Sequence, residues 1–423
     1  MNFVVLGAGP AGIHAVEAIR KLNPLDPITL ISGEPELALS PVMLTYWVGG
    51  KVSKKNLLFR DPSWPERMRI DLRLNSRAGS LNTASKKTML ADGQEISYDR
   101  VLIATGSVPI VLPIPGIQSR GVNVLHDLRD GEAILEKASG VKEVVIIGGG
   151  FIGLKLACHL NERGFGVTIV EKEPKLASRM FDLRTSRLVE KKLREGRIRV
   201  EVGVEVTEVL QEKGWVSGTR LKDGRIIPCQ RIIQAVGVKP NIAFLKGSGI
   251  EIEGGVLVNE RMETNVPAVF AAGDVAMTID PITSKRVNNA TWPAASRQGL
   301  VAGTNMGGGT RVYHHNFALN SLHLFGLQVM TAGHSYYEEE PGVDISLEKR
   351  GENYRKIVVR SGHLIGFILT GNVSGAGFLL NRMKRRGEIL SDPRDLLSSS
   401  LSPQEDLSPN LGYSHGIHFQ QPS

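Results

Sequence analysis

The sequence predicts an α/β protein made of two three-layer domains of the same design, followed by a small α+β domain. Two repeats carry this prediction. An apolar strand, a glycine-rich turn and a helix follow one another in residues 1–17, and the same order returns in residues 142–158. A second stretch also occurs twice, because residues 90–106 superimpose without gaps on residues 221–237. Each copy of this stretch follows its own glycine-rich turn, so the repeated unit is a whole domain and not a short solenoid repeat.

The paired stretches share turn and strand signals. Each contains an Asp-Gly turn, a short β-rich piece and an apolar strand that ends in glycine. The matching residues are Leu90 with Leu221, Asp92 with Asp223, Gly93 with Gly224, Arg100 with Arg231, and Gly106 with Gly237. Around them, alternating strand and helix patterns predict doubly wound sheets, with second strands at 28–32 and 167–171.

The pattern of the chain changes past residue 312. Longer apolar stretches with a hairpin signal at 361–363, followed by a helical stretch, predict a small α+β domain. The last stretch is rich in serine and proline and predicts a flexible tail or a segment that orders on a partner. We assign 1–112 and 241–312 to the first domain, 113–240 to the second, 313–387 to the C-terminal α+β domain and 388–423 to the tail.

Composition limits the class of protein. With 423 residues, 41% of them hydrophobic and 22% charged, the chain predicts a globular protein of two or three domains. Cys158 and Cys229 are the two cysteines, which excludes a disulfide framework and any four-cysteine metal or iron–sulfur site. Glycines interrupt the apolar runs before they reach about 18 residues, so no membrane span is expected. No signal peptide is recognised, and a cytoplasmic location is expected.

The net charge of +8 raises the question of a nucleic-acid partner. The lysines and arginines are scattered, aromatic residues make up 5% of the chain, and no nucleic-acid-binding motif is present. Phosphate-bearing cofactors or an acidic protein partner account for the charge equally well. We expect no nucleic-acid binding.

The first glycine-rich turn has the G-x-G-x-x-G spacing of a dinucleotide site. Gly7 permits the tight turn, Gly9 lets the backbone approach a pyrophosphate, and Gly12 lets the helix pack closely on the strand. The following helix, expected over 13–22, presents free N–H groups to the phosphates. Glu34 is the ribose-binding acid expected about 20 residues further on. The alternative is that the glycines serve packing alone.

The second turn repeats this spacing after the strand 144–147. Its glycines are Gly148, Gly150 and Gly153. Glu171 ends the next strand, where a carboxylate accepts hydrogen bonds from a ribose 2′-OH and repels a 2′-phosphate, which favours NAD over NADP. Lys172 and Arg179 weaken this preference, because either could reach a 2′-phosphate.

Taken with the two turns, three further stretches carry a family resemblance. They are LIATGSVP at 102–109, AVGVKPN at 235–241 and TNVPAVFAAGDVA at 264–276. Together they resemble the FAD-dependent pyridine nucleotide oxidoreductases, with the closest similarity to the rubredoxin/ferredoxin reductase and nitrite reductase flavoprotein branch. The resemblance covers roughly residues 1–385. It implies a Rossmann-like first domain that binds FAD and an inserted second domain that binds NAD(H).

The resemblance also implies which residues bind each cofactor. For FAD they are Gly7, Gly9, Pro10, Ala11, Gly12, Glu34, Ala104, Thr105, Gly106, Gly273 and Asp274. For NAD they are Gly148, Gly150, Phe151, Ile152, Gly153, Glu171 and Gly237. Asp274 matches the residue that binds the FAD ribityl chain, and an acid at that strand end needs donors such as a polyol supplies. Residues 288–306 resemble the helix whose N-terminus points at the flavin pyrimidine ring, with Trp292 as an aromatic wall or a plain core tryptophan.

The redox cysteines of the resembled family are missing. Thiol-dependent relatives carry cysteine on the first helix or near residues 40–46, where this chain has Met43 as its sulfur. Cys158 and Cys229 are expected to be small core residues. FAD alone is therefore expected to pass electrons onward after hydride exchange with NAD(H), and a one-electron iron–sulfur protein is the natural partner. No metal site is expected, because the histidines are not at ligand spacing.

One residue departs from the family pattern beside the second turn. Many relatives read G-x-E after the third glycine, whereas this chain has Lys155. In those relatives the glutamate lies near the flavin–nicotinamide contact, so a lysine reverses the local charge and is predicted to favour negative charge on the reduced flavin. The alternative is a lysine turned to solvent.

Three functions remain open from the sequence. The first is an NAD(H)–FAD electron-transfer flavoprotein, as a subunit of a larger iron–sulfur complex or as a homodimer. The second is a free-standing NADH:rubredoxin or ferredoxin reductase, or an NADH oxidase. The third, from another class, is a non-enzymatic flavin-binding sensor, which failure of NADH to bleach bound FAD would favour.

Overall fold

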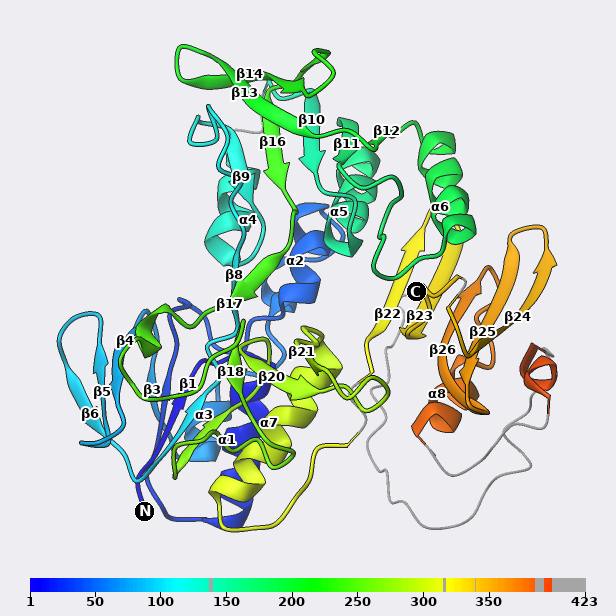
Figure 1. Ribbon diagram of the computed structural model, residues 1–423. Coiled ribbons are helices and arrows are strands. Elements are labelled where there is room, and N and C mark those ends of the chain that lie inside the picture. Colours follow the sequence, from blue (N-terminus) through cyan, green and yellow to red (C-terminus); the bar gives the residue numbers. More distant parts are fainter. Residues whose placement is uncertain (137–139, 315–316, 339, 385–391, 398–423) are drawn as a thin grey trace.

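The computed structural model consists of two α/β units and a C-terminal antiparallel sheet (Figure 1). It describes residues 1–136, 140–314, 317–338, 340–384 and 392–397. The first unit lies below the second in Figure 1, and the C-terminal sheet lies beside both. Within the described residues, no helix is long and apolar enough to cross a membrane.

The first unit is built on a five-stranded parallel sheet with the order β19-β7-β1-β2-β3. Its strands are β1 (Phe3–Leu6), β2 (Ile28–Ile31), β3 (Asp71–Arg73), β7 (Arg100–Ile103) and β19 (Val269–Ala271). Two helices, α1 (Pro10–Leu22) and α7 (Trp292–Met306), pack closely against each other beside this sheet. A side chain at Gly299 or Gly303 would meet the backbone oxygen of Ala11 or Ala15 at 2.0 and 2.3 Å, so glycine sets this approach.

The second unit repeats this plan with the order β12-β11-β10-β16-β9, again parallel. Its strands are β9 (Val122–Val124), β10 (Glu143–Ile147), β11 (Gly166–Glu171), β12 (Arg199–Val202) and β16 (Arg231–Gln234). Its helices are α4 (Leu128–Leu135), α5 (Phe151–Glu162) and α6 (Leu183–Glu195). In both units the strand before the glycine-rich turn is fully flanked by parallel neighbours, which explains its uninterrupted apolar sequence.

The predicted internal repeat is confirmed by equivalent small sheets. The first contains β4 (Ala78–Asn82), β5 (Lys87–Leu90) and β6 (Glu95–Ser97), and the second contains β13 (Val206–Glu212), β14 (Trp215–Leu221) and β15 (Ile226–Pro228). The Asp-Gly turns place Gly93 and Gly224 at φ of +89° and +88°, the left-handed region that glycine tolerates. The two units are joined by an antiparallel pair, β8 (Ser107–Pro109) with β17 (Val238–Pro240).

Shorter elements complete the two units. They are α2 (Pro41–Val48), η1 (Lys54–Leu57), α3 (Trp64–Met68), η2 (Ala243–Leu245), β18 (Val256–Leu257), β20 (Ala276–Ile279) and β21 (Arg286–Val287). Two predicted helix boundaries differ from the structure. The first helix begins at Pro10 and not at residue 13, because proline is well suited to the first turn. The helix expected over 288–306 begins at Trp292, since Thr291 is still in an extended conformation.

The C-terminal sheet is antiparallel, with the order β22-β23-β26-β25-β24. It comprises β22 (Leu319–Leu324), β23 (Leu327–Gly333), β24 (Val343–Arg350), β25 (Asn353–Arg360) and β26 (His363–Thr370), followed by α8 (Ala376–Lys384). The predicted hairpin is confirmed, because Arg360 pairs with His363 across the turn. Apolar residues of β22 and β23 share a core with the second unit. The buried Lys356 amine also lies 3.3 Å from the Asp182 carboxylate at the start of α6.

Part of the stretch predicted as a flexible tail is ordered. Pro393–Leu397 form a 3₁₀ helix, η3, and Leu396 is buried in the core of the C-terminal sheet. The pair of leucines in this otherwise polar stretch supplies the apolar contact that orders it. Residues 388–391 and 398–423 lie outside the described residues.

Candidate active site

The first glycine-rich loop leaves open space at one glycine and none at the other two. A Cβ on Gly7, whose φ is +119°, would lie 2.0 Å from the Ala104 backbone oxygen, and a Cβ on Gly12 would lie 1.8 Å from the Gly7 oxygen. A Cβ on Gly9 would meet no atom within 4 Å. Gly7 and Gly12 therefore serve chain packing, whereas Gly9 keeps free the space in which a pyrophosphate approaches the backbone.

The second loop has the same geometry. A Cβ on Gly148 would lie 2.4 Å from the Ala235 oxygen and one on Gly153 would lie 2.1 Å from the Gly148 oxygen, while Gly150 again has no atom within 4 Å. Gly9 and Gly150 are the N-caps of α1 and α5, and neither helix start has a side-chain cap. The N–H groups in the first turns of α1 and α5 therefore lack a side-chain acceptor, and a phosphate would provide one.

The two ribose-binding acids differ in their surroundings. The Oε2 atom of Glu34 is buried without a hydrogen-bond partner among the described residues. Burial and the nearby carboxylate of Asp127 raise the pKa of Glu34. A ribose hydroxyl would donate to this oxygen and satisfy it, so Glu34 fits its predicted role.

Glu171 has its hydrogen bonds within the chain. Its Oε2 atom accepts from the Gly149 N–H at 2.6 Å, and its Oε1 atom accepts from the Glu173 N–H at 2.8 Å. The carboxylate thus fixes the second glycine-rich loop against the end of β11. The neighbouring cations Lys172 and Arg179 are exposed.

Asp274 lies where the first loop, the end of β7 and the start of α7 come together. The Ser107 hydroxyl donates to its Oδ2 atom at 3.2 Å, and burial raises its pKa. Gly273, at φ +85°, donates its N–H to the Gln298 side chain of α7 at 2.8 Å. A buried acid that accepts from one hydroxyl among the described residues is suited to accept further hydrogen bonds from a polyol chain.

Other predicted FAD residues surround this point. Ala104 donates its N–H to the Leu6 oxygen at 2.8 Å, and the Thr105 hydroxyl donates to the Asn241 oxygen at 3.0 Å. Gly106 adopts φ +66° at the crossover, and Gly237 adopts φ +108° at its counterpart. These positions bring the predicted residues of the first unit to one edge of its sheet.

Trp292 occupies the first turn of α7 and contacts another aromatic ring. Its ring centroid lies 4.6 Å from that of Phe59, with the rings nearly perpendicular at 78°. The side chain is half-buried, so one side remains accessible. This position suits an aromatic wall beside a planar cofactor.

Lys155 lies at the contact between the two units. One turn further along α5, the buried His159 approaches the Thr45 oxygen of α2 at 2.9 Å and contacts the Tyr46 ring at 4.6 Å. Residues four apart share a helix face, so Lys155 is on the side of α5 that meets α2. Burial lowers its pKa, and within the described part of the chain no carboxylate pairs with it. The structure thus places a half-buried cation between the units.

Neither cysteine is suited to redox chemistry. Cys158 and Cys229 are both buried, and burial raises the pKa of each thiol to about 12. A reactive cysteine requires an accessible thiolate, which these environments disfavour. The helix α2, where thiol-dependent relatives were expected to carry their cysteine, has none.

The remaining predicted residues line the first turn of α5. Ile152 is 47% exposed, and Phe151 packs against Phe181 with ring centroids 5.4 Å apart. An exposed isoleucine at a free helix N-terminus is consistent with a surface that a dinucleotide covers. The described residues contain no cluster of three or more metal-ligating side chains, and His315 lies outside them.

Sequence reasoning missed several polar residues around the site. They are Ser107, Asp127, Asn288 and Gln298. Asn288 donates to the backbone oxygens of Asp274 and Ala276 at 2.7 and 3.0 Å and so holds the strand end in place. Ser107 lies in the stretch 102–109, and Asn288 and Gln298 lie in 288–306, but the resemblance gave these residues no role of their own. Asp127 lies in no recognised stretch.

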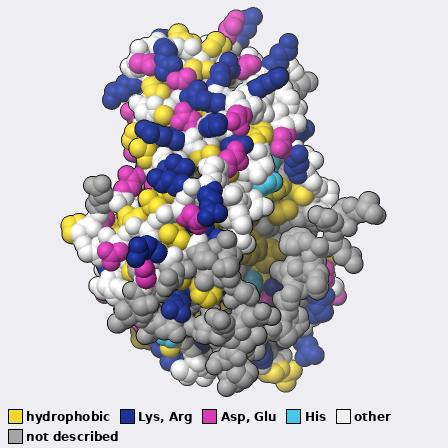
Figure 2. All heavy atoms as spheres, turned by 90° about the vertical axis from the view of Figure 1, so that its right-hand side faces the viewer, with side chains coloured by type: hydrophobic (Ala, Val, Ile, Leu, Met, Phe, Trp, Pro, Cys, Tyr) yellow, Lys and Arg dark blue, Asp and Glu magenta, His cyan; other side chains and the backbone are white. Residues whose placement is uncertain are grey.

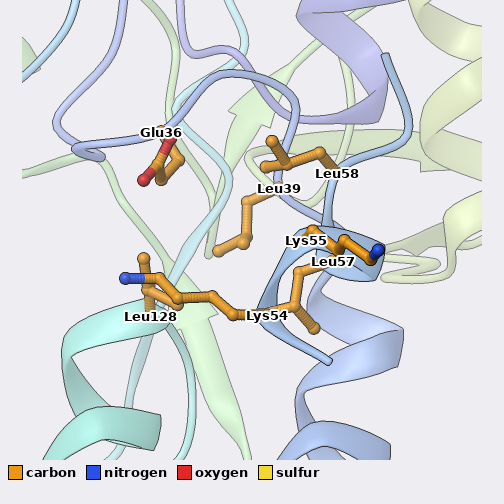
Figure 3. Close-up of a pocket in the computed structure, with 7 residues that line it drawn as sticks. All are labelled: Glu36, Leu39, Lys54, Lys55, Leu57, Leu58 and Leu128. Carbon is orange, nitrogen blue, oxygen red and sulfur yellow. The ribbon is translucent and has the colours of Figure 1, made fainter. Parts of the chain in front are cut away.

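A hollow of about 320 Å³ adjoins the first site (Figure 3). Its lining residues are Glu36, Leu39, Lys54, Lys55, Leu57, Leu58 and Leu128. Figure 3 shows Lys54 reaching from η1 across the hollow toward the start of α4, and its amine pairs with Glu132 at 2.8 Å. The hollow therefore lies at the junction of the two units and is not part of either glycine-rich loop.

Comparison with known proteins decides the family. The model of the family described as "Pyridine nucleotide-disulphide oxidoreductase" matches residues 1–299. The chain belongs to this family. A relative from Aromatoleum evansii, the NADH-dependent phenylglyoxylate dehydrogenase subunit epsilon, is 30% identical over 391 residues, with 92% of each chain covered. The Bacillus subtilis nitrite reductase [NAD(P)H] is 28% identical over 406 residues, which cover 95% of this chain and 49% of that protein.

Solved structures agree with this assignment. A NAD-dependent persulfide reductase from A. fulgidus matches with a TM-score of 0.84 and 27% identity, covering 91% of this chain and 77% of that one. The NADH:rubredoxin oxidoreductase from Clostridium acetobutylicum matches with a TM-score of 0.75 and 25% identity, covering 91% and 94%. The protein is an NAD(H)-dependent flavoprotein oxidoreductase that uses FAD and NAD(H) as cofactors. This finding removes the non-enzymatic sensor from the open functions.

The described residues fit both cofactors. The open space at Gly9 and Gly150 would accommodate a pyrophosphate at each loop, and a ribose hydroxyl would satisfy the unpaired Glu34 oxygen. When bound, FAD accepts hydride from NADH and can release its electrons one at a time. The protein's own contribution would be to hold each dinucleotide at the N-terminus of a helix, because alignment and electrostatics are what a fold supplies to cofactor chemistry.

Proposed function

We propose that the protein transfers hydride between NAD(H) and FAD and exchanges electrons between FAD and an iron–sulfur protein, as the flavoprotein subunit of a larger complex. The observation that carries this proposal is the lack of any usable thiol, since both cysteines are buried with raised pKa values. Without a thiol relay, electrons leave from the flavin itself. Among relatives, one is named a subunit of a phenylglyoxylate dehydrogenase and another an "Assimilatory nitrate reductase electron transfer subunit".

In this proposal the first unit binds FAD and the second binds NAD(H). The N–H groups at the start of α1 and α5 bind the pyrophosphates, Glu34 accepts from the FAD ribose, and Asp274 accepts from the ribityl chain. The support is the open space at the middle glycines, the unpaired Glu34 oxygen and the isolated Asp274 carboxylate. The residues assigned from the sequence keep these roles as proposals.

Lys155 and Trp292 complete the proposed catalytic residues. Lys155 supports negative charge on the reduced flavin, because it is a half-buried cation at the contact of α5 with α2 and lacks a carboxylate partner in the described structure. Trp292 forms an aromatic wall at the start of α7, whose N-terminal dipole acts in the same direction. Both effects favour electron storage on the flavin.

A free-standing reductase or oxidase is the second candidate function. It is favoured by the NADH oxidase of Methanocaldococcus jannaschii, which is 32% identical over 317 residues. That relative is named an oxidase. The present chain, however, has no cysteine where thiol-dependent NADH oxidases are expected to carry one. The electron acceptor distinguishes the two functions.

The acceptor can be tested with the FAD-loaded protein and NADH under argon. A bacterial ferredoxin, a rubredoxin and a low-molecular-weight disulfide are offered in parallel, and oxygen uptake is measured separately. We expect turnover with an iron–sulfur protein, no turnover with the disulfide and slow oxygen uptake. Turnover with oxygen that exceeds turnover with both carriers would assign the protein to the oxidases. Size-exclusion chromatography of the native protein then tests whether it is a subunit.

A further inference from the structure

The loop between β11 and α6 encloses the second glycine-rich turn. Gly149, inside that turn, donates its N–H to the Glu171 carboxylate at 2.6 Å and accepts the N–H of Ala177 at 3.0 Å. A Cβ on Gly149 would lie 2.6 Å from the Leu176 side chain, so the loop packs directly on this residue. We call residues 172–182 the coenzyme loop, because the proposed function places NAD(H) at this turn. The position of the coenzyme loop therefore sets the position of the glycine-rich turn.

The coenzyme loop has a strained backbone and depends on its neighbours for support. Ala177 adopts φ +47°, a left-handed conformation that is unfavourable for alanine. Phe181 packs against Phe151 in the first turn of α5, with ring centroids 5.4 Å apart. Strained backbone persists where the surrounding structure over-determines it. On the side of the coenzyme loop away from the turn, that support comes from the C-terminal sheet.

The segment after β23 supplies hydrogen bonds to the backbone at the end of the coenzyme loop. The buried Ser335 hydroxyl donates to the Met180 oxygen at 3.0 Å. Glu338 accepts from the Leu183 N–H at 2.8 Å and pairs with Lys175 at 3.3 Å. Figure 2 views the molecule from the side on which the C-terminal sheet lies in Figure 1, and Lys and Arg side chains are interspersed there with Asp and Glu. Exposed ion pairs contribute little, so the two bonds to backbone atoms are the more specific contacts.

A buried polar network ties the end of the coenzyme loop to β25. Asp182, the N-cap of α6, accepts from the Tyr354 hydroxyl at 2.6 Å and from the Thr185 N–H at 2.8 Å. The Lys356 amine, which is 2% exposed, lies 3.3 Å from the same carboxylate. Burial acts to raise the pKa of Asp182, but the bonds from Tyr354 and Thr185 leave that pKa below its ordinary value, so the carboxylate stays charged. A buried charge with several partners fixes them in one arrangement.

The same segment after β23 also contacts the first unit. The Nε2 atom of His334 lies 3.0 Å from the Asp280 carboxylate, which follows β20. The His334 ring stacks on that of Tyr337, with centroids 5.1 Å apart. Asp280 also accepts from the Ile282 N–H at 2.7 Å. Residues 334–338 therefore contact the first unit at one end and the coenzyme loop at the other.

These contacts make the C-terminal sheet part of the coenzyme site. We propose that residues 334–338, together with Tyr354 and Lys356, position the coenzyme loop and so set the affinity of the second unit for NAD(H). They are positioning residues, because they act on the coenzyme through the loop and the glycine-rich turn. The proposal rests on the proposed function, in which the second unit binds NAD(H).

The test compares two double variants of the FAD-loaded protein, with ferricyanide as acceptor. S335A/E338A removes the hydroxyl and the carboxylate that hold the coenzyme loop. The control S374A/E348A removes the same two groups from positions whose bonds lie within the C-terminal domain. We expect S335A/E338A to raise the KM for NADH and the Kd for NAD⁺ about tenfold, with kcat within about twofold and FAD content unchanged. The control should keep all of these values within about twofold.

Two further measurements separate positioning from a general loss of stability. In S335A/E338Q the amide oxygen can still accept the Leu183 N–H, so the rise in KM should shrink to about threefold. Hydrogen exchange measured by mass spectrometry should be faster in residues 172–182 of S335A/E338A and unchanged there in the control. Y354F, which removes the hydroxyl bound to Asp182, should also raise the KM for NADH and leave kcat unchanged.

G150A separates this proposal from the assignment of the second unit, because it fills the turn itself. We expect G150A to raise the Kd for NAD⁺ at least as much as S335A/E338A does. If G150A weakens NAD⁺ binding but S335A/E338A changes the KM for NADH no more than the control does, the positioning role is overturned. It is also overturned if S335A/E338A lowers kcat or FAD content along with the affinity. An unchanged Kd in G150A would overturn the assignment of the second unit, and the proposal with it.

Discussion

The two nucleotide-binding units of this protein place the same residue types at the same points, yet use some of them differently. In both units the first and third glycines are blocked by backbone oxygens and the middle glycine faces open space. In both, a repeat arginine binds the carbonyl end of a helix: Arg100 donates to Asn305 and Met306 of α7, and Arg231 donates to Ala133, Ile134 and Glu136 at the end of α4. The acids Glu34 and Glu171 differ between the units. One Glu34 oxygen has no partner among the described residues, whereas Glu171 accepts from the Gly149 N–H.

The contacts that build the scaffold are therefore separable from the contacts that select the ligand. The shared features are tight turns, close helix packing and hydrogen bonds to helix C-terminal carbonyls. They meet the packing and hydrogen-bonding requirements of the backbone. The differing features involve side chains that reach into the cofactor space. A repeated unit can therefore keep its fold while its two copies bind different cofactors, as proposed here for FAD and NAD(H).

The largest expected effect comes from filling the open space at one middle glycine. G9A places a methyl group where the FAD pyrophosphate approaches, and we expect a loss of about 3 kcal/mol in FAD binding, about 100-fold in Kd. The matched variant G150A should keep its FAD and its yellow colour but raise the NADH Kd by a similar factor. Flavin content after purification and NADH binding by fluorescence measure the two effects. Loss of FAD in G150A, with retention in G9A, would reverse the assignment of the units.

The next effect concerns the repeat arginines. Arg231 is 5% exposed and donates to three carbonyl oxygens, so R231M is expected to cost about 3 kcal/mol of unfolding free energy. R100M removes bonds to two carbonyls from a half-buried residue and should cost about 1–2 kcal/mol. Methionine keeps the packing of the side-chain stem. Urea unfolding monitored by circular dichroism measures both, and equal costs would contradict the difference in burial.

Asp274 predicts a pH dependence confined to the first unit. Its pKa in the folded protein is raised by burial, so the folded protein without FAD holds this proton more tightly than the unfolded chain. Stability of the protein without FAD therefore falls as pH rises from the unfolded pKa through the raised folded pKa. FAD hydroxyls donate to the carboxylate form, so FAD affinity should rise over the same range. In D274N both trends should flatten, and calorimetric FAD titrations at several pH values would reveal an unchanged slope if the assignment is wrong.

The smallest expected effect is that of the cation at the contact of the units. At an effective dielectric constant of about 20, a unit charge on the order of 10 Å away is worth about 1–2 kcal/mol. K155Q should therefore disfavour reduced flavin by up to about this amount, and K155E by more. The flavin midpoint potential measures this directly, with R163Q at the C-cap of α5 as a control. No shift in K155E would mean that the lysine is turned to solvent.

Much of this comparison could be predicted from the sequence, because it rests on local rules. The glycine spacing, the strands before each turn and the repeat of Arg100 with Arg231 are encoded by residue type and order. The hydrogen bonding of the two acids could not be predicted, because it depends on whether the backbone N–H of Gly149 or of a distant loop reaches the carboxylate. Likewise, Ser107 reaches Asp274 and Gln298 reaches the Gly273 N–H through contacts between distant segments. Leu396 orders part of a polar tail by packing on a sheet that local sequence does not show.

In the proposed function the flavin takes its electrons directly from the nicotinamide coenzyme, and no thiol pair shares them. Anaerobic titration of the FAD-loaded protein with NADH tests it most directly. We predict that bleaching of the flavin absorbance is complete after about one equivalent of NADH per FAD, because no thiol pair shares the electrons. A requirement for about two equivalents, with two thiols appearing after denaturation under argon, would contradict the account.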